Sequence, residues 1–381
     1  MLTDDELAAW DAHWQAWDSF ATWAIRFLAL TVDEELRFAL VDTLVQARYA
    51  LRDALAADNR SVDPVRELFT ATWTRLAPLV GQAVRDVDST TALSYLAFIS
   101  AGDALAAVDA SGQATGLRIS RATLLEFARS LAPAITDEDI EYTLAPDPTL
   151  RRLFGFPGEV AITTPQARNF WLDLFIPRAW AQSRMADLAA HLNTWSPQRD
   201  DIDDYLAAVD GLLGEVESEE LQRGKVPADV ATVYNALLRA TAWQETCWRQ
   251  FIDKQGTLQP IRSSAGSIGL MQVNQHVWRG IYDVERLGAD IAYNAWAGNE
   301  ILVHYLVDYA IRKKEHEITG SVDNLARATY AVYNGGPGHL KRYRLDDTKL
   351  SLRAIDDAFW GKYTSIQSDG PSAVRSCYGP G

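Results

Sequence analysis

Residues 230–252 read VATVYNALLRATAWQETCWRQFI, and this stretch decides the fold of the C-terminal part of the chain. It is nearly all apolar, and its charged residues are Arg239, Glu245 and Arg249. An apolar run of this length predicts a helix that lies in the core of a domain. A carboxylate within such a helix needs an explanation, because charged groups are rarely buried without a partner or a task.

The setting of Glu245 suits an acid that delivers a proton to a glycosidic oxygen. Cleavage of a glycosidic bond needs such an acid, and a carboxyl group serves only where its surroundings favour the protonated form. Apolar neighbours do this because they disfavour the charged form, and Glu245 lies in the aromatic segment 242–248, AWQETCW. Taken alone, the residue is more simply an (i, i+4) partner of Arg249, a pair worth about 0.2–0.5 kcal/mol.

Three further patterns follow Glu245 in the chain. The first is the segment 263–272, SSAGSIGLMQ, within a stretch rich in Ser and Gly that we expect to be a loop. The second is Asn294 with Gly298, in a helix expected over about 290–314. The third is the segment 332–336, VYNGG, which follows a helix expected over about 322–332.

In this order the patterns resemble the lytic transglycosylases with a goose-type-lysozyme-like catalytic domain, the soluble lytic murein transglycosylase family. That family has Glu-Ser on a helix, then a Ser-x-x-Gly-Ala-x-Gly-Leu-Met-Gln loop, an Asn-containing helix and Ala-Tyr-Asn-Ala-Gly. The resemblance covers about residues 230–345. The chain departs from the family at supporting positions, where the usual Ser or Ala is replaced by Thr246, Ser267, Val332 and Gly335.

The resemblance implies an all-α, lysozyme-like catalytic domain that acts on peptidoglycan. Glu245 is expected to protonate the oxygen between N-acetylmuramic acid and N-acetylglucosamine, and then to act as base on the muramyl C6 hydroxyl. That hydroxyl attacks C1 of its own sugar and gives a 1,6-anhydro product. An internal nucleophile benefits from high effective molarity and needs no second catalytic carboxylate, which two-carboxylate glycosidases require.

The resemblance also assigns the supporting residues. Tyr333 is expected to hydrogen-bond and orient Glu245, and Ser263 to contact the acid or an N-acetyl group. The residues expected to bind the glycan are Gly269, Leu270, Met271, Gln272, Asn294 and Asn334. Simpler roles remain open at several positions: Met271 in the core, Asn294 as a structural hydrogen-bonder, and the basic run 339–344 as a solvated face or a contact with acidic peptide stems.

Two other functions fit the same residues. The first is a goose-type lysozyme-like muramidase, in which water replaces the C6 hydroxyl. The mass of the products distinguishes a muramidase from a lytic transglycosylase. The second is a non-catalytic glycan-binding scaffold. Loss of Glu245 or Tyr333 would have indicated a scaffold, and both residues are present.

Composition limits the partners and the location. The net charge of −15 argues against a nucleic-acid partner. No Cys/His cluster indicates a metal, no cofactor is expected, and no apolar run reaches the roughly 18 residues of a membrane span. No signal peptide opens the sequence, so the protein is either cytosolic or a mature form. The resemblance favours the periplasm, with attachment to the membrane through a removed N-terminal segment as a further option.

We expect a helical N-terminal domain over residues 1–225 and the catalytic domain over residues 226–381. All of the excess acidic charge lies before residue 230, and the segment 223–227, RGKVP, is typical of a linker. The tryptophans at 10, 14 and 17 recur at helical spacing and are expected in the core rather than as a sugar platform. The N-terminal domain could dock a protein of wall synthesis or of a secretion machinery, extend the groove or serve as a scaffold.

The chain has two cysteines, Cys247 and Cys377. An even pair fits one disulfide in an oxidising compartment, and two buried thiols fit equally well. Because a wall-cleaving enzyme acts outside the cytoplasm, we predict the disulfide, which would attach the C-terminal tail to the catalytic helix.

Overall fold

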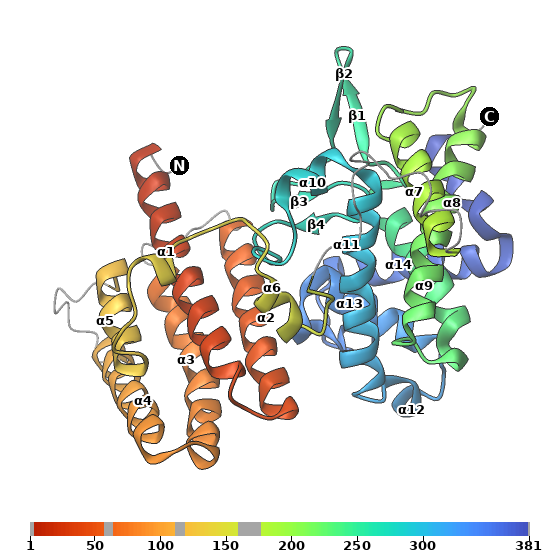
Figure 1. Cartoon of the computed structure of the whole chain (residues 1–381). Coiled ribbons are helices and arrows are strands. Elements are labelled where there is room, and N and C mark those ends of the chain that lie inside the picture. Colours follow the sequence, from red (N-terminus) through yellow and green to blue (C-terminus); the bar gives the residue numbers. More distant parts are fainter. Residues whose placement is uncertain (1–3, 57–63, 111–118, 159–176, 380–381) are drawn as a thin grey trace. The chain divides into compact units, whose positions relative to one another are not determined.

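The computed structural model describes residues 4–56, 64–110, 119–158 and 177–379, and it is predominantly helical (Figure 1). The expected all-α fold is confirmed. In the described part, strands form two short antiparallel pairs: β1 (Phe251–Lys254) with β2 (Thr257–Pro260), and β3 (Ser267–Ile268) with β4 (Val273–Asn274). None of the described helices is long and apolar enough to span a membrane.

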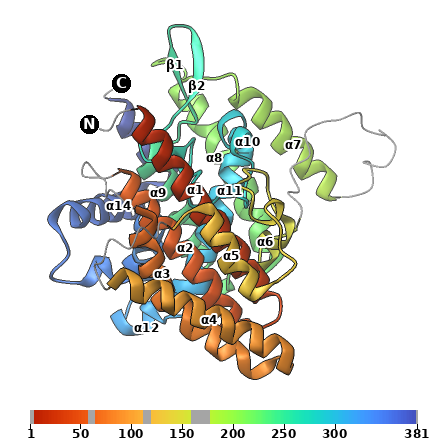
Figure 2. The same cartoon turned by 90° about the vertical axis from the view of Figure 1, so that its left-hand side faces the viewer.

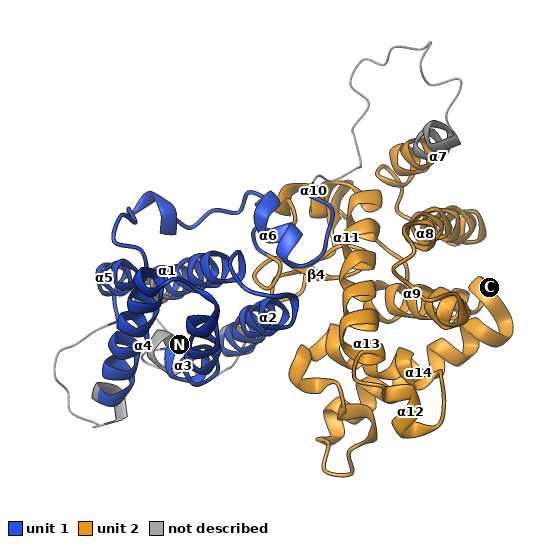
Figure 3. Ribbon diagram, turned by 60° about the horizontal axis from the view of Figure 1, so that its bottom comes forward, with its two compact units in different colours: residues 1–158, 279–281 blue, residues 159–278, 282–381 orange. Residues whose placement is uncertain are grey.

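The chain forms two compact units (Figure 3). Unit 1 comprises residues 1–158 together with 279–281, and unit 2 comprises residues 159–278 and 282–381. The helices of unit 1 are α1 (Asp4–Ala29), α2 (Glu34–Ala56), α3 (Pro64–Ala83), α4 (Ser89–Ala110), α5 (Arg121–Leu131) and α6 (Pro148–Leu153).

Aromatic rings from several helices fill the core of unit 1. Phe127 of α5 stacks on Phe98 of α4, with ring centroids 4.4 Å apart, and also contacts Phe20 of α1 and Trp73 of α3. Trp14 and Trp17 are buried, as expected for core residues, whereas the side chain of Trp10 lies outside the described residues. A buried ring offers no face to a sugar, so neither Trp14 nor Trp17 forms a glycan platform.

A buried charge cluster lies beside this aromatic core. Asp18 of α1 is 2% exposed and accepts hydrogen bonds from the guanidinium groups of Arg48 and Arg279. Arg48 Nη1 also donates to the carbonyl oxygen of Arg279 over 2.8 Å. Burial alone would raise the pKa of Asp18, but the charges and hydrogen bonds of the two arginines hold it below its ordinary value. Asp18 is therefore ionised and fully paired.

The segment 279–281 belongs to unit 1 because its backbone is bound there. The amide of Asp147 donates to the carbonyl of Gly280 over 2.6 Å, and Arg151 donates to the carbonyl of Ile281 over 3.0 Å. Arg151 is 1% exposed, so this bond satisfies a buried guanidinium as well as a buried carbonyl.

Unit 2 is built around α9, the helix that carries Glu245. Its helices are α7 (Pro177–Leu192), α8 (Ile202–Arg223), α9 (Ala231–Thr246), α10 (Val284–Ala289), α11 (Ile291–His304), α12 (Glu315–Thr319), α13 (Asn324–Gly335) and α14 (Leu350–Asp369). The helix α9 packs against α8, α13 and α14, and a π-helical segment, Tyr305–Ile311, continues α11. The hairpin β1–β2 projects away from these helices in both Figure 1 and Figure 2.

The unit boundary expected near residue 225 is not where the structure divides the chain. The helix α8 lies before that position and belongs to unit 2, because Arg239 of α9 forms ion pairs with Asp210 and Glu217 of α8 over 2.7 and 2.6 Å. The change in composition instead marks the end of α8, where Gly224 adopts a φ of 72°. The number of charged residues in a segment reflects how much of it is exposed to solvent, whereas the boundary between the two units is set by which helices pack together.

The helix expected over residues 230–252 is also shorter than predicted. Its regular part ends at Thr246, because Cys247 and Trp248 both adopt left-handed conformations with φ of 54° and 62°. Neither is glycine, and each such residue costs about 1–2 kcal/mol. The cost is offset in part by burial of the Trp248 ring, whose indole nitrogen donates to the Arg239 carbonyl over 3.0 Å.

We predict that Asp18→Asn lowers the free energy of unfolding by about 3–5 kcal/mol, because it leaves two buried guanidinium groups without their carboxylate. The folded-state pKa of Asp18 lies below its ordinary value of 3.8. Its contribution is therefore fully present above about pH 4 and is lost as the pH falls through the folded pKa. Urea unfolding of the full chain, followed by tryptophan fluorescence across this pH range, measures both effects.

The control is Glu126→Gln, which removes the carboxylate of an exposed pair with Arg129. That change should cost no more than about 1 kcal/mol. Equal stability of Asp18→Asn and the wild type would contradict the importance given to the buried cluster.

Candidate active site

Glu245 lies half-buried in the last turn of α9, and a tyrosine of α13 holds it. The hydroxyl of Tyr330 donates a hydrogen bond to Oε1 of Glu245 over 2.9 Å. The Tyr330 ring stacks on Phe359 of α14, with centroids 4.0 Å apart and planes 4° from parallel. The carboxylate is thus oriented by a phenol whose own ring is fixed by packing.

The environment keeps Tyr330 in its neutral, donating form. Burial raises the pKa of Tyr330 well above its ordinary value, and the charge of Glu245 and the hydrogen bond to it add to that rise. A phenol with a raised pKa remains protonated at neutral pH, so it serves as a lasting donor to the carboxylate.

Tyr333, the tyrosine expected to orient Glu245, has a different partner. Its hydroxyl donates to the carbonyl oxygen of Met271 over 2.6 Å. A phenol carries a single proton, so in this arrangement Tyr333 supports the loop that contains Met271 while Tyr330 orients the acid. Sequence analysis missed Tyr330 because it lies one helical turn before Tyr333 on the same face.

Two buried side-chain amides hold the loop formed by residues 263–272. Asn294 of α11 accepts a hydrogen bond from the amide of Met271 over 2.8 Å and donates to the carbonyl of Ile268 over 2.8 Å. Gln250 accepts from the amide of Leu270 over 2.7 Å and donates to the carbonyl of Leu287 over 2.9 Å. These bonds satisfy interior backbone groups of the loop and tie it, through Gln250, to α10.

Glycine at two positions makes this packing feasible. Gly269 has a φ of 72°, and a β-carbon there would lie 2.3 Å from Oε1 of Gln250 and 2.4 Å from Nδ2 of Asn294. A β-carbon on Gly298 of α11 would lie 2.3 Å from that of Met271. The two amides and the methionine therefore fit only because both residues lack side chains.

Several residues expected to bind the glycan are instead interior residues. The side chains of Leu270, Met271 and Asn294 have no exposed surface, so none can touch a sugar in this conformation. Leu270 and Met271 are core residues, and Asn294 is a structural hydrogen-bonder. Gly269 is likewise required by its backbone conformation and its neighbours.

The remaining candidates retain some exposure and have structural bonds as well. Gln272 is half-buried and donates to the carbonyl of Gly269 over 2.8 Å. Ser263 is exposed, and its hydroxyl oxygen accepts from the amide of Ser267, which closes the turn. Asn334 is half-buried and accepts from Arg342 over 3.1 Å.

The basic run 339–344 is largely used within unit 2. Arg342 is 4% exposed and forms a buried ion pair with Asp356 of α14. Arg344 and Tyr343 both bind the buried carboxylate of Glu315. These side chains position Asn334 and α12 and do not form the solvated face that the sequence suggested.

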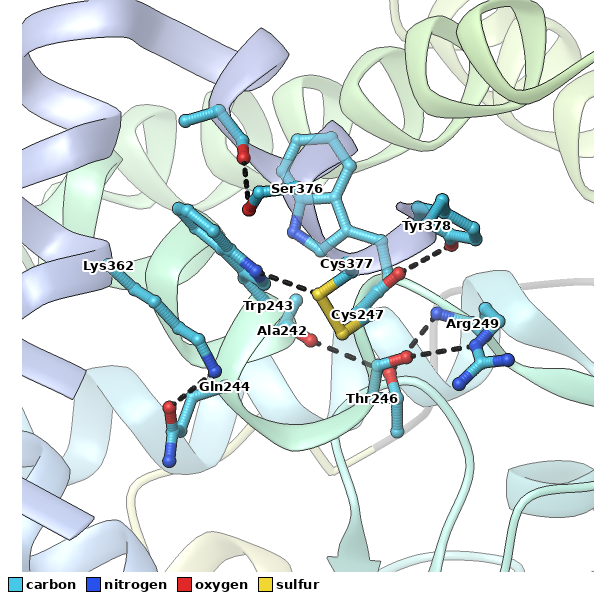
Figure 4. Close-up of a disulfide and its surroundings, with 12 residues drawn as sticks. Ala242, Trp243, Gln244, Thr246, Cys247, Arg249, Lys362, Ser376, Cys377 and Tyr378 are labelled. Carbon is cyan, nitrogen blue, oxygen red and sulfur yellow. Dashed lines mark hydrogen bonds between the residues drawn. A yellow bond between two sulfur atoms is a disulfide. The ribbon is translucent and has the colours of Figure 1, made fainter. Parts of the chain in front are cut away.

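The end of α9 is attached to both neighbouring segments. Thr246 donates from its hydroxyl to the carbonyl of Leu270 over 2.8 Å. The predicted disulfide is present and joins Cys247 to Cys377 (Figure 4). Tyr378 donates to the carbonyl of Cys247 over 2.7 Å. The residues directly after Glu245 are therefore fixed covalently and by hydrogen bonds.

A lysine that sequence analysis did not identify lies beside the acid. Lys362 of α14 donates to Oε1 of Gln244 over 2.7 Å, and its ammonium lies 5.8 Å from the ring centroid of Trp243 (Figure 4). Burial lowers the pKa of Lys362, and the negative charge of Glu245 opposes that shift. No sequence pattern identifies Lys362 or Phe359, since both lie beyond the region of family resemblance.

Comparison with known families, curated proteins and solved structures finds no match to this chain. The interpretation of the site therefore rests on its residues and their geometry. Within the described ranges, no group of three or more His, Cys, Asp or Glu side chains could hold a metal ion. What the geometry provides is one oriented carboxylate, a neutral phenol bound to it and a nearby cation.

On the expectation from the sequence that Glu245 is the acid of a peptidoglycan-cleaving enzyme, we predict that Tyr330→Phe lowers kcat/KM for digestion of purified peptidoglycan about 10- to 100-fold, because a hydrogen bond to a charged group is worth about 1.5–3 kcal/mol. The pH–rate profile should change as well, because the carboxylate loses its donor. Tyr333→Phe is the matched control on the same helix face. It should instead lower the free energy of unfolding by about 1–3 kcal/mol, because the Met271 carbonyl loses its donor. A larger activity loss and a changed pH profile in Tyr333→Phe, with Tyr330→Phe unaffected, would reverse the assignment.

We also predict that Cys377→Ser lowers the free energy of unfolding by about 2–5 kcal/mol, because the bridge closes a sequence separation of 130 residues. Ser376→Ala, next to the bridge, is the control and should remain within about 0.5 kcal/mol of the wild type. Guanidinium unfolding under oxidising conditions measures both variants. Equal stability of Cys377→Ser and the wild type would show that the bridge contributes little.

Proposed function

We propose that this protein is a peptidoglycan lytic transglycosylase. In this proposal it cleaves the β-1,4 bond between N-acetylmuramic acid and N-acetylglucosamine and forms a 1,6-anhydromuramic acid end. The observation that carries the proposal is the half-buried Glu245 at the end of α9, with Tyr330 donating to its carboxylate over 2.9 Å. Its place ahead of the SSAGSIGLMQ loop and the YNGG turn adds sequence support.

Glu245 acts twice in the proposed reaction. As the protonated acid it donates its proton to the glycosidic oxygen while the bond from C1 to that oxygen breaks. The resulting carboxylate then accepts the proton of the muramyl C6 hydroxyl, whose oxygen forms the new bond to C1. The carboxyl group ends in its starting state and no water is consumed. Tyr330 remains bound to the same oxygen and keeps the group aligned in both steps.

The distribution of carboxylates supports an internal nucleophile. Two-carboxylate glycosidases use a second Asp or Glu as nucleophile or as base for water. From Lys254 to Tyr282, a stretch that includes the whole loop, the sequence contains neither residue, and α13 contains neither. A mechanism in which the substrate supplies its own nucleophile agrees with this composition.

The disulfide supports a site of action outside the reducing cytoplasm, since bridges of this kind persist in oxidising compartments. We place the activity in the periplasm, where peptidoglycan is accessible. The substrate is then the glycan strand, with its peptide stems attached.

The test is mass spectrometry of the products from purified peptidoglycan. We predict fragments that end in 1,6-anhydromuramic acid, each lighter by one water than a reducing-end fragment. Glu245→Gln should reduce digestion at least about 10²–10⁴-fold while the protein stays folded, because the acid and the base are lost together. Mostly reducing ends would establish a muramidase instead. A wild-type protein that binds glycan without releasing fragments would establish a scaffold.

A further inference from the structure

A cavity lined by three cations opens where α9 gives way to the β1–β2 hairpin. Arg249, Lys254 and Arg262 line it together with the apolar side chains of Ile252, Pro260 and Ile261. No residue that lines this cavity carries a carboxylate. In a chain with a net charge of −15, such a concentration of positive charge needs a physical account.

The register of the hairpin places Lys254 on the same face as Ile252, and Arg249 and Arg262, which lie outside the two strands, line the same cavity. Ile252 and Lys254 are two residues apart in β1, so both point to the same side of the hairpin. Asp253 lies between them and therefore points to the opposite side. Its carboxylate accepts a hydrogen bond from the amide of Gly256 over 2.7 Å, in the turn of the hairpin. The one acidic residue of this segment is thus turned away from the cavity.

Two arginines of α8 and α9 are neutralised by carboxylates, whereas the three cavity cations form no ion pair within the described residues. Arg223 pairs with Glu219 and Glu220, and Arg239 with Asp210 and Glu217. In the part of the chain that the structure describes, the side chains of Lys254 and Arg262 are both exposed and form no ion pair or hydrogen bond.

Arg249 binds neutral groups only. Its Nε donates to the carbonyl of Thr246 over 3.4 Å, and its guanidinium lies 5.9 Å from the ring centroid of Tyr378. Three like charges therefore face one cavity without compensation, which is the arrangement expected of a site that binds an anion.

We propose that this cavity binds a carboxylate of the peptide stem of peptidoglycan; the inference rests on the proposed function. Stems carry carboxylates separated by short apolar side chains, which matches cations interleaved with Ile252, Pro260 and Ile261. Arg249 follows Glu245 by four residues, so their Cα atoms lie at most about 14 Å apart. An extended stem of four residues has a similar reach. A sugar bound at Glu245 can therefore place its own stem in the cavity.

The experiment compares two forms of one probe. The probe is the disaccharide N-acetylglucosaminyl-N-acetylmuramic acid with a tetrapeptide stem, which lacks the bond that the enzyme is proposed to cleave. One form has free stem carboxylates, and in the other they are amidated. Calorimetry on the full chain should show about 5- to 10-fold tighter binding of the acidic form, and added salt should reduce the difference, as for exposed ion pairs.

The decisive variant is Lys254→Gln with Arg262→Gln, in which the preference for the acidic form should fall to about 2-fold or less. The matched control, Lys313→Gln with Lys349→Gln, removes the same charge at two exposed positions that do not line the cavity and should keep the preference. Melting temperatures verify folding, and each single variant at position 254 or 262 gives a second measurement with an intermediate preference.

Equal affinity of the wild type for both forms, including no binding of either, would overturn the inference, as would a preference that survives in the double variant. These outcomes are measured as binding affinities, so they do not depend on whether the protein cleaves glycan. A wild type that releases anhydro fragments but binds both forms alike disproves the stem site and keeps the proposed function. One that prefers the acidic form but releases no fragments keeps the site and disproves the proposed activity.

Discussion

The backbone of residues 269–271, between β3 and β4, lies in the interior of unit 2 outside any regular strand or helix, and two side-chain amides compensate for this. Asn294 and Gln250 bind the amides and carbonyls that would otherwise be buried and unpaired. Each unpaired group would cost about 1–3 kcal/mol. Gly269 is required for the approach of both amides, and Tyr333 is needed for the Met271 carbonyl. The loop is therefore a structural element that places its neighbours, and its most family-like residues serve the interior.

The acid, in turn, is held from three directions. The loop binds the end of α9 through Thr246, α13 supplies Tyr330, and α14 supplies Phe359 behind Tyr330 and Lys362 beside Gln244. The C-terminal segment adds the disulfide directly after Glu245. Such an arrangement limits the motion of a carboxylate that, in the proposed reaction, meets two different oxygens in one cycle. This attachment requires two consecutive non-glycine residues, Cys247 and Trp248, to adopt an unfavourable positive φ.

The sequence predicted the helical class and the helix that carries Glu245, because apolar periodicity is a local signal. The cysteine pair alone left the disulfide open, and its prediction rested on the expected oxidising compartment. It could not separate Tyr330 from Tyr333, since residues one turn apart share a helix face and only packing decides which partner each reaches. It placed Leu270 and Met271 in the groove because a family motif records which residues recur and not which are buried. The end of α9 was missed because positive φ at Cys247 and Trp248 has no signature without glycine. Arg249, Lys254 and Arg262 could be recognised as a group only from the cavity that they line, because the chain must fold back on itself to bring them together.

The membership of residues 279–281 in unit 1 has a consequence for how the chain can be divided. The polypeptide leaves unit 2 for three residues and then returns, so neither unit corresponds to one continuous piece of sequence. A truncated chain that begins after residue 158 would keep Arg279 but lose Asp18, and would expose a guanidinium that is 3% exposed in the intact protein. A fragment that begins after residue 158 would therefore contain Glu245 and the loop 263–272 but would not be self-contained. A transfer of unit 1 to another protein would have to include residues 279–281, so that Asp18 keeps Arg279 as its partner.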